Sequence, residues 1–181
     1  MDNTEGRLDE LFQEVRYLRD RMDILDCVNA YGRGLDRLDS RLIREAYHPD
    51  AVDQHGPFLG DVDQFVPFAI ECEASFLATH HGISSHNCEI DGSTAHAESY
   101  VHFFVRLPDG ATIGFGAGRY VDRLEKREGK WAIVVRRFLI DCTFEVPSSA
   151  WLGPDWEAVV GRRDPGDFSY QRPLARPTAN G

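Results

Sequence analysis

The fold is decided by one continuous stretch, ISSHNCEIDGSTAHAESYVHFFVRLPDGATIGFGAGRYVDRLEKREGKWAIVVRRFLI, residues 83–140. Apolar and polar residues alternate along most of it, which is the pattern of strands with two unlike faces. Turn signals interrupt the pattern at Asp91-Gly92, Pro108-Asp109-Gly110 and Glu128-Gly129. The stretch therefore predicts a meander of long antiparallel strands, with runs at 83–90, 95–107, 111–124 and 130–146.

Helical patterns precede these strands. An apolar stripe at three- and four-residue steps predicts a first amphipathic helix that reaches toward Leu38, with a bend at Gly32 and Gly34; its members are Leu8, Leu11, Phe12, Val15, Leu18, Met22 and Leu25. Further helices are predicted at 40–47 and 61–79, with a brief strand near Val52 between them. Helices first and a strand meander afterwards indicate the α+β class.

Composition indicates one globular domain rather than a disordered or fibrous chain. Of 181 residues, 42% are apolar and 28% are charged, and a chain of this length can build a full core without disulfides. The formal net charge is −10, which disfavours binding to phosphate backbones and anionic membranes. We therefore expect neither nucleic acid nor a membrane among its partners.

The cysteines and the N-terminus indicate a cytoplasmic protein. The four cysteines are widely separated, with no CxxC pair and no zinc-ligand spacing, so they are expected to be reduced. The N-terminal residues are acidic and lack the apolar core of a signal peptide, and no later segment is apolar enough to span a bilayer.

The last 35 residues have a different composition. From Pro147 onward they hold five of the nine prolines and two of the three tryptophans. We expect a domain at 1–146 and a C-terminal arm at 147–181 that packs on the domain or on a neighbouring subunit. Trp151, Trp156, Phe168 and Tyr170 are too apolar for a free linker, whereas 173–181 resembles a frayed end.

Asp36 is the first candidate for chemistry. At 100° per residue it lies within about 20° of Leu11, Leu18 and Leu25, in the apolar stripe of the first helix. An inward carboxylate needs a donor, and the alternative is a residue near the helix end that turns to solvent.

Histidines are the available partners. Along an extended strand His81, Ile83 and Ser85 face one way, and His80, Gly82, Ser84 and His86 face the other. His80 and His81 therefore cannot easily bind one metal ion together, and no metal site is expected. His102 shares a strand face with Tyr100 and Phe104, which makes it either a cavity residue or a core histidine. His48 and His55 flank a turn and are expected to be exposed.

Nucleophile and phosphate-loop motifs are absent from the sequence. There is no GxSxG and no glycine-rich loop that opens a helix; GFGAGRY at 114–120 lies inside a predicted strand. Acid–base chemistry by histidine and aspartate remains, with no cofactor expected.

Three segments resemble the SnoaL-like branch of the nuclear transport factor 2-like superfamily. They are YGRGLDRLD at 31–39 followed by YHPDAV at 47–52, THHGISSHNCEIDGSTAHAESY at 79–100, and GRYVDRLEKREGKWAIVVRRFLIDC at 118–142. The resemblance covers about residues 8–145, and GRRDPGDFSY at 161–170 is similar to the family's C-terminal tail. It implies a cone-shaped α+β barrel in which a strongly curved antiparallel sheet wraps helices and encloses one cavity.

The resemblance also implies a site. It places Asp36 and His81 on the family's catalytic dyad, Tyr31 on a tyrosine of its dehydratases, and Arg136 on an arginine near the cavity rim. A carboxylate that accepts from one imidazole nitrogen fixes the tautomer and leaves the other nitrogen as a base. Tyr31 is expected to donate to the substrate, and His102 to serve as a second acid. Aromatic residues are expected to line the pocket: Phe58, Phe65, Phe68, Phe76, Phe104 and Phe115.

The leading hypothesis is a cofactor-independent, dehydratase-like lyase that acts on a cyclic, largely apolar small molecule, aromatic or steroid-like. The same dyad could drive isomerisation or polyketide cyclisation, because both also begin with enolisation. A non-catalytic alternative is the small subunit of an aromatic-ring hydroxylating dioxygenase, which has this fold, or a ligand-binding module.

Both faces of the last predicted strand are apolar. Trp131, Ile133, Val135 and Leu139 are expected to point one way and Val134, Phe138 and Ile140 the other. One face can cover the helices, and the second needs a partner or the arm. We therefore expect a homo-oligomer, and the resemblance to the dehydratases favours a trimer.

Overall fold

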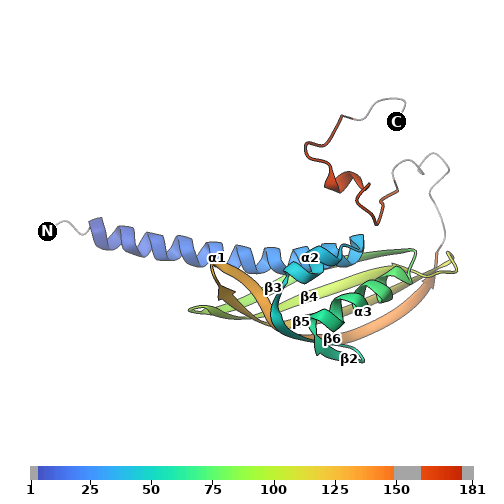
Figure 1. Cartoon of the computed structure of the whole chain (residues 1–181), viewed down its shortest axis with the longest axis horizontal. Helices are drawn as coiled ribbons and strands as arrows, with labels where there is room; N and C mark the ends of the chain where they lie inside the picture. Colours follow the sequence, from blue (N-terminus) through green and yellow to red (C-terminus); the bar gives the residue numbers. More distant parts are fainter. Residues whose placement is uncertain (1–3, 149–159, 177–181) are drawn as a thin grey trace.

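The computed structural model describes residues 4–148 and 160–176. Its elements, in chain order, are α1 (Thr4–Arg37), α2 (Ser40–Glu45), β1 (Tyr47–His55), β2 (Phe58–Asp61), α3 (Val62–Ala74), β3 (Ala78–Asp91), β4 (Thr94–Arg106), β5 (Thr112–Arg127), β6 (Lys130–Pro147) and the short 3₁₀ turn η2 (Phe168–Tyr170). The helices lie on one face of a curved sheet, and the N-terminal part of α1 projects past its end (Figure 1). The predicted α+β class is confirmed.

The six strands form one open sheet in the order β2-β1-β6-β5-β4-β3. The predicted meander is confirmed for β3 to β6, whose neighbours are antiparallel. Gly92, Gly110 and Gly129 occupy its turns with φ of 59°, 67° and 83°, a conformation that glycine adopts without steric cost. Two details differ from expectation: β1 runs parallel to β6, and the sheet wraps the helices without closing into a barrel.

Helix α1 is continuous through Gly32 and Gly34, so the two glycines do not interrupt it. Gly34 is required by packing instead. A Cβ there would lie 2.8 Å from Ile43 Cγ1 and 3.0 Å from the Ile43 backbone nitrogen. Only glycine lets α2 approach α1 this closely, and Asp39 caps α2 by accepting from Arg41 N and Leu42 N.

The face of α1 that packs on the sheet is not the predicted one. Its buried apolar residues are Ile24, Val28, Tyr31 and Leu35. The predicted stripe is exposed over most of its length, with Leu11 52% and Leu18 60% accessible. That stripe lies on the part of α1 that extends beyond the sheet, where nothing in the described chain covers it. Intrahelical spacing alone could not show where the sheet ends.

Strict alternation also fails where the strand register shifts, and two of these shifts change an expected face. The β3–β4 register shifts between Ile83 and His86, which brings His86 to the inner face, where its Nδ1 lies 2.8 Å from the Oγ of buried Ser99. The β5–β6 register shifts between Arg123 and Leu124, so Ile133 pairs with Leu124 inside and Val135 with Arg123 outside. Both expected face assignments were wrong because an extra residue reverses the alternation.

The described part of the C-terminal segment packs against the end of α1. Arg33 stacks on Tyr170, with 4.9 Å from Cζ to the ring centroid, and Tyr170 donates to Asp39 Oδ2 at 3.0 Å. Phe168, in contrast, is 64% exposed. The expectations for Trp151 and Trp156 lie outside the described residues. Among the described helices, none combines the length and apolarity needed to cross a lipid bilayer.

Candidate active site

A carboxylate and a histidine meet at the C-terminal end of α1. Asp36 Oδ1 lies 2.8 Å from Nδ1 of His81, the fourth residue of β3. The His81 backbone N–H also donates to Asp36, at 3.1 Å to Oδ1 and 3.0 Å to Oδ2. Thr79 Oγ1 adds a contact of 3.2 Å to Oδ1. Asp36 is only 7% exposed, so these donors replace its lost hydration.

Asp36 is buried for a reason that differs from the sequence argument. The leucine stripe that seemed to carry it inward is exposed, and the sheet-facing side of α1 is centred on Val28 and Tyr31. Asp36 is covered instead by β3 and by Arg163 of the C-terminal segment, whose Nε donates to the Asp36 carbonyl at 3.0 Å. A segment 127 residues away in sequence therefore helps to bury it.

Arg163 connects the elements around the Asp36–His81 pair. Its Nη1 donates to the carbonyls of Glu73 (2.8 Å) and Phe76 (3.0 Å), and its Nη2 donates to Thr79 Oγ1 (3.0 Å). The guanidinium thus satisfies carbonyls at the end of α3 and fixes the threonine that contacts Asp36. No sequence pattern predicts the role of Arg163, because its partners come from three separate segments.

We expect Arg163→Ala to lower the free energy of unfolding by about 1–3 kcal/mol, because several buried acceptors lose a charged donor. Urea denaturation followed by circular dichroism measures it. Arg162→Ala is the matched control: Arg162 is mostly exposed and its side chain pairs with Asp164 at 3.0 Å, so its loss is expected to cost under about 1 kcal/mol. Equal effects of both variants would contradict a bridging role for Arg163.

His81 also lines an apolar cavity of about 200 Å³. The cavity lies between α1, α3 and the inner face of the sheet and is lined mostly by aromatic and aliphatic side chains: Tyr31, Leu35, His55, Phe65, Phe68, Ala69, Cys72, Glu73, Phe76, His81, Phe103, Val105, Tyr120 and Phe138. Because Nδ1 is occupied by Asp36, Nε2 is the nitrogen available to a ligand.

Glycines in β5 make room for the rings. A Cβ at Gly116 would lie 2.1 Å from Cζ of Phe103, so the Phe103 ring occupies the space of a missing side chain. Phe103 packs on His81 with ring centroids 5.7 Å apart. The glycine-rich segment GFGAG at 114–118 is therefore not a phosphate loop; its glycines leave space for the rings in the cavity wall.

Tyr31 and Phe65 line this cavity with His81, and their rings are stacked 6.3 Å apart. Burial raises the pKa of the Tyr31 hydroxyl well above its ordinary value, so the hydroxyl keeps its proton. Its oxygen is buried and contacts no hydrogen-bond partner in the described part of the chain. It is thus a buried donor that lacks an acceptor, on a residue that lines the same cavity as His81.

The sequence prediction was wrong about three other side chains. His102, Phe104 and Phe115 lie on the outer face of the sheet, because β4 and β5 turn Phe103 and Tyr120 inward. The Phe104 and Phe115 rings pack on each other there, with centroids 5.1 Å apart. The alternation along β4 and β5 correctly grouped these residues on one face of the sheet, but it could not show which face is the concave one.

Arg136 was expected at the cavity rim, and the structure buries it completely beneath the cavity floor. Its Nε and Nη2 donate to Asp122 at 2.8 and 2.6 Å. Its Cζ lies 4.2 Å from the ring centroids of both Tyr31 and Tyr120. A guanidinium held between two rings and a carboxylate supports the site from behind and does not reach a ligand.

Two polar residues of the cavity were missed by the sequence analysis. Glu73 Oε1 lies 3.9 Å from His81 Nε2, and Glu73 Oε2 is buried without a hydrogen bond among the described residues. His55 was expected to be exposed, yet its ring stacks on Phe138 at 4.4 Å and its Nδ1 lies 3.4 Å from Asp53. The parallel pairing of β1 with β6 brings it to the inner face.

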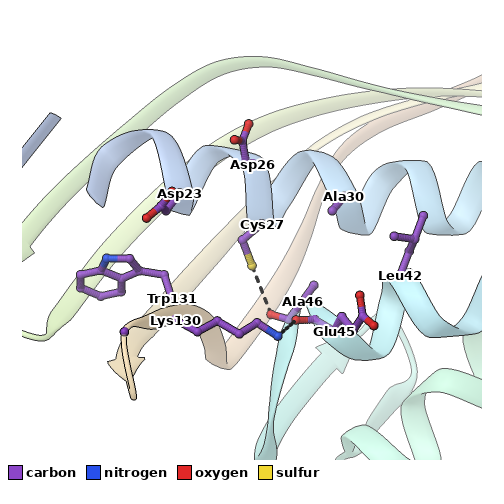
Figure 2. A pocket seen from close by; sticks show the side chains of 10 residues that line it. Asp23, Asp26, Cys27, Ala30, Leu42, Glu45, Ala46, Lys130 and Trp131 are labelled. Atoms are coloured by element: carbon purple, nitrogen blue, oxygen red, sulfur yellow. Dashed lines mark hydrogen bonds between the residues drawn. The ribbon is translucent and has the colours of Figure 1, made fainter. Parts of the chain in front are cut away.

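A second, larger hollow of about 380 Å³ lies between α1, α2 and the β5–β6 turn (Figure 2). There the thiol of Cys27 donates to the Ala46 carbonyl at 3.2 Å, and Lys130 Nζ donates to the Glu45 carbonyl at 2.7 Å. Burial raises the pKa of Cys27 to about 12, so the thiol stays protonated. Within the described ranges, no three His, Cys, Asp or Glu side chains are grouped to hold a metal ion.

Comparison with family models matches residues 16–137 to the SnoaL-like domain. The chain belongs to the SnoaL-like family. This places it in the nuclear transport factor 2-like superfamily, as its segments had suggested. No match was found among curated protein sequences.

Solved structures share the SnoaL-like fold at low identity. A putative scytalone dehydratase from Novosphingobium aromaticivorans is 20% identical, with a TM-score of 0.66 over 74% of this chain and 92% of the other. A hexachlorocyclohexane dehydrochlorinase from Novosphingobium barchaimii is 15% identical, with a TM-score of 0.65 over 78% and 99%. A putative aromatic ring hydroxylase from Novosphingobium aromaticivorans is 20% identical, with a TM-score of 0.64 over 72% and 94%. At these identities the likeness extends to the fold alone.

Proposed function

We propose that this SnoaL-like protein is a cofactor-independent lyase that eliminates water or another leaving group from a cyclic, largely apolar small molecule. The observation that carries the proposal is the Asp36–His81 hydrogen bond of 2.8 Å, which leaves Nε2 as the free imidazole nitrogen of a residue that lines an apolar cavity. The dehydratase and dehydrochlorinase among its structural neighbours support this class of reaction.

In the proposed reaction, His81 Nε2 takes a proton from the carbon beside an activating carbonyl or aromatic group. The C–H electron pair becomes a C=C bond as the C–O or C–halogen bond on the next carbon breaks. Asp36 stabilises the imidazolium that forms, and the Tyr31 hydroxyl donates to the oxygen on which charge develops. His81 then returns its proton to the leaving group.

Cavity size limits the substrate. At about 200 Å³ the cavity is smaller than the 300–1,000 Å³ typical of drug-sized ligands. This volume supports a substrate of one or two rings rather than a steroid.

The test is product analysis. Purified protein is incubated with a panel of one- and two-ring β-hydroxy and β-halo carbonyl compounds, and products are identified by mass spectrometry. Loss of water or hydrogen halide supports the lyase. A rearranged product of unchanged mass supports the isomerase or cyclase alternative. Binding without conversion, or co-purification with an iron-containing subunit, would overturn the enzyme proposal.

Glu73 is proposed to act with His81 during elimination, because its carboxylate lies 3.9 Å from the nitrogen that carries the proton. We expect Glu73→Gln to lower kcat by about 10–100-fold, since neutral glutamine neither stabilises the imidazolium nor relays its proton. Glu71→Gln, an exposed change on the same helix, is the control and is expected to leave kcat unchanged. Steady-state kinetics on the substrate from the panel measures both, and equal kcat values would remove Glu73 from the reaction.

We also propose that the outer face of the sheet joins copies of the chain. Several apolar side chains on it are 39–53% exposed: Tyr100, Phe104, Val121, Leu139, Phe144 and Val146. So many large apolar side chains exposed on one sheet face favour an interaction surface. A trimer is the proposed state, following the resemblance to dehydratases, and sedimentation as a stable monomer would contradict it.

A further inference from the structure

The projecting part of α1 carries a heptad repeat. Apolar residues recur at alternating steps of three and four, which gives three successive heptads with both core positions filled. The a positions are Leu8, Val15 and Met22, and the d positions are Leu11, Leu18 and Leu25. The five from Leu8 to Met22 are 44–60% exposed. We call this row of six side chains the heptad seam.

The heptad seam points away from the rest of the molecule. At 100° per residue, its mean direction lies about 140° from that of Ile24, Val28, Tyr31 and Leu35, which pack on the sheet. Figure 1 shows the N-terminal part of α1 extending past the strands. A second helix can therefore lie along the seam without meeting the sheet.

The seam has a defined end. Arg33 lies about 30° from its mean direction, and there the C-terminal segment covers the helix. Tyr170 stacks on the Arg33 guanidinium, and the Ser169 hydroxyl lies 3.3 Å from Arg33 Nη2. Nothing in the described chain covers the stretch from Leu8 to Met22, and the whole seam is about 27 Å long. Residues 5–19 are all exposed, and a lone helix of this length is marginal in water. The N-terminal part of α1 thus lacks the packing that would stabilise it.

Charges beside the seam identify a second copy of the chain as the occupant. In a parallel two-stranded coiled coil, a g residue meets the e residue of the partner's next heptad. Here Glu14 (g) meets Arg19 (e), and Arg21 (g) meets Asp26 (e), so both pairs are of opposite charge. Leucine at every d position, with Val15 at the central a position, also fits two parallel strands. Arg21 donates to the Cys88 carbonyl at 2.7 Å, so the Glu14–Arg19 pair is the freer one.

We propose that α1 dimerises two copies of this protein through the heptad seam as a short parallel coiled coil. The two domains would then lie on opposite outer sides of the two-helix rod. This contact is separate from the sheet face and independent of the catalytic proposal.

The main test compares neighbouring substitutions on α1. Leu18→Asp places a charge in the seam, whereas Tyr17→Asp changes a residue of similar exposure (47% against 60%) on the opposite side. Sedimentation equilibrium should show that Leu18→Asp halves the mass of the wild-type assembly, from dimer to monomer or, if the sheet face forms a trimer, from hexamer to trimer. Tyr17→Asp should leave the mass unchanged. Wild-type protein that sediments as a 20.5 kDa chain, or equal masses for both variants, would overturn the proposal.

Charge reversal and crosslinking test the register and direction. Glu14→Arg should raise the dimer dissociation constant about tenfold at low salt, since two symmetric pairs become repulsive, and adding Arg19→Glu should restore it. With Cys72 and Cys142 changed to Ser, Val15→Cys should give a disulfide-linked dimer on oxidation, and Arg16→Cys should not. No rescue by the second reversal, or no crosslink at position 15, would rule out the parallel pairing.

Discussion

Asp36→Asn is expected to lower kcat by about a thousandfold or more with the fold intact. Asparagine fills nearly the same space, and its amide oxygen can still accept the His81 backbone N–H. It cannot stabilise an imidazolium, and it allows the tautomer in which Nε2 holds the proton and is no base. His81→Ala, which removes the base itself, is expected to lose at least as much.

Kinetics on the substrate identified by product analysis measures these variants, and circular dichroism verifies their fold. Because Asp36 and His81 act as a unit, the double variant is expected to be little slower than either single one. Asp23→Asn, an exposed change on the same helix, is the control. Wild-type turnover in Asp36→Asn would exclude the dyad. If the losses in kcat of the two single variants add in the double variant, Asp36 and His81 act independently and not as a unit.

Arg136→Met is expected to lower the free energy of unfolding by about 3–5 kcal/mol. The side chains of Arg136 and Asp122 are both fully buried, so the substitution leaves the Asp122 carboxylate buried without its partner. Leaving one charge of a buried ion pair uncompensated costs about 3–5 kcal/mol. Urea denaturation measures the change. Arg119→Met is the matched control, since it breaks partly exposed pairs with Glu98 and Asp141 at 2.8 and 3.3 Å and is expected to cost under about 1 kcal/mol.

Replacing both buried partners gives the diagnostic result. Arg136→Met combined with Asp122→Leu removes the orphaned charge and is expected to recover much of the lost stability. No recovery would mean that packing against Tyr31 and Tyr120, rather than charge, dominates the role of Arg136. A small loss of stability in Arg136→Met itself would show that water or neighbouring donors stabilise the Asp122 carboxylate in place of the guanidinium.

The candidate site shows how far sequence patterns reach. Asp36, His81 and Tyr31 were predicted from their resemblance to a family, and the structure brings Asp36 into contact with His81 and places Tyr31 in the same cavity wall. Arg163 and Glu73 were not predicted. Their importance comes from partners far away along the chain, and no local pattern records such partners.

Local patterns failed where chain geometry departs from the ideal. His86 reached the inner face because of a bulge, and Arg136 moved from an expected rim to the buried interior. His55 entered the cavity through a parallel strand pairing that the meander did not predict. The position of each of these side chains depends on how its strand pairs with its neighbours, and alternation within one strand does not predict that pairing.

The amino-acid sequence was enough to predict the class of fold, the meander and its turns, because these depend on local periodicity and on glycines at positive φ. It also determined the spacing of the heptad seam, but not that the seam lies outside the domain. Only the tertiary structure decided which strand face is concave, which side of α1 meets the sheet, and which polar groups surround His81. Those facts depend on contacts between distant segments, whose free energy exists only once the chain has folded.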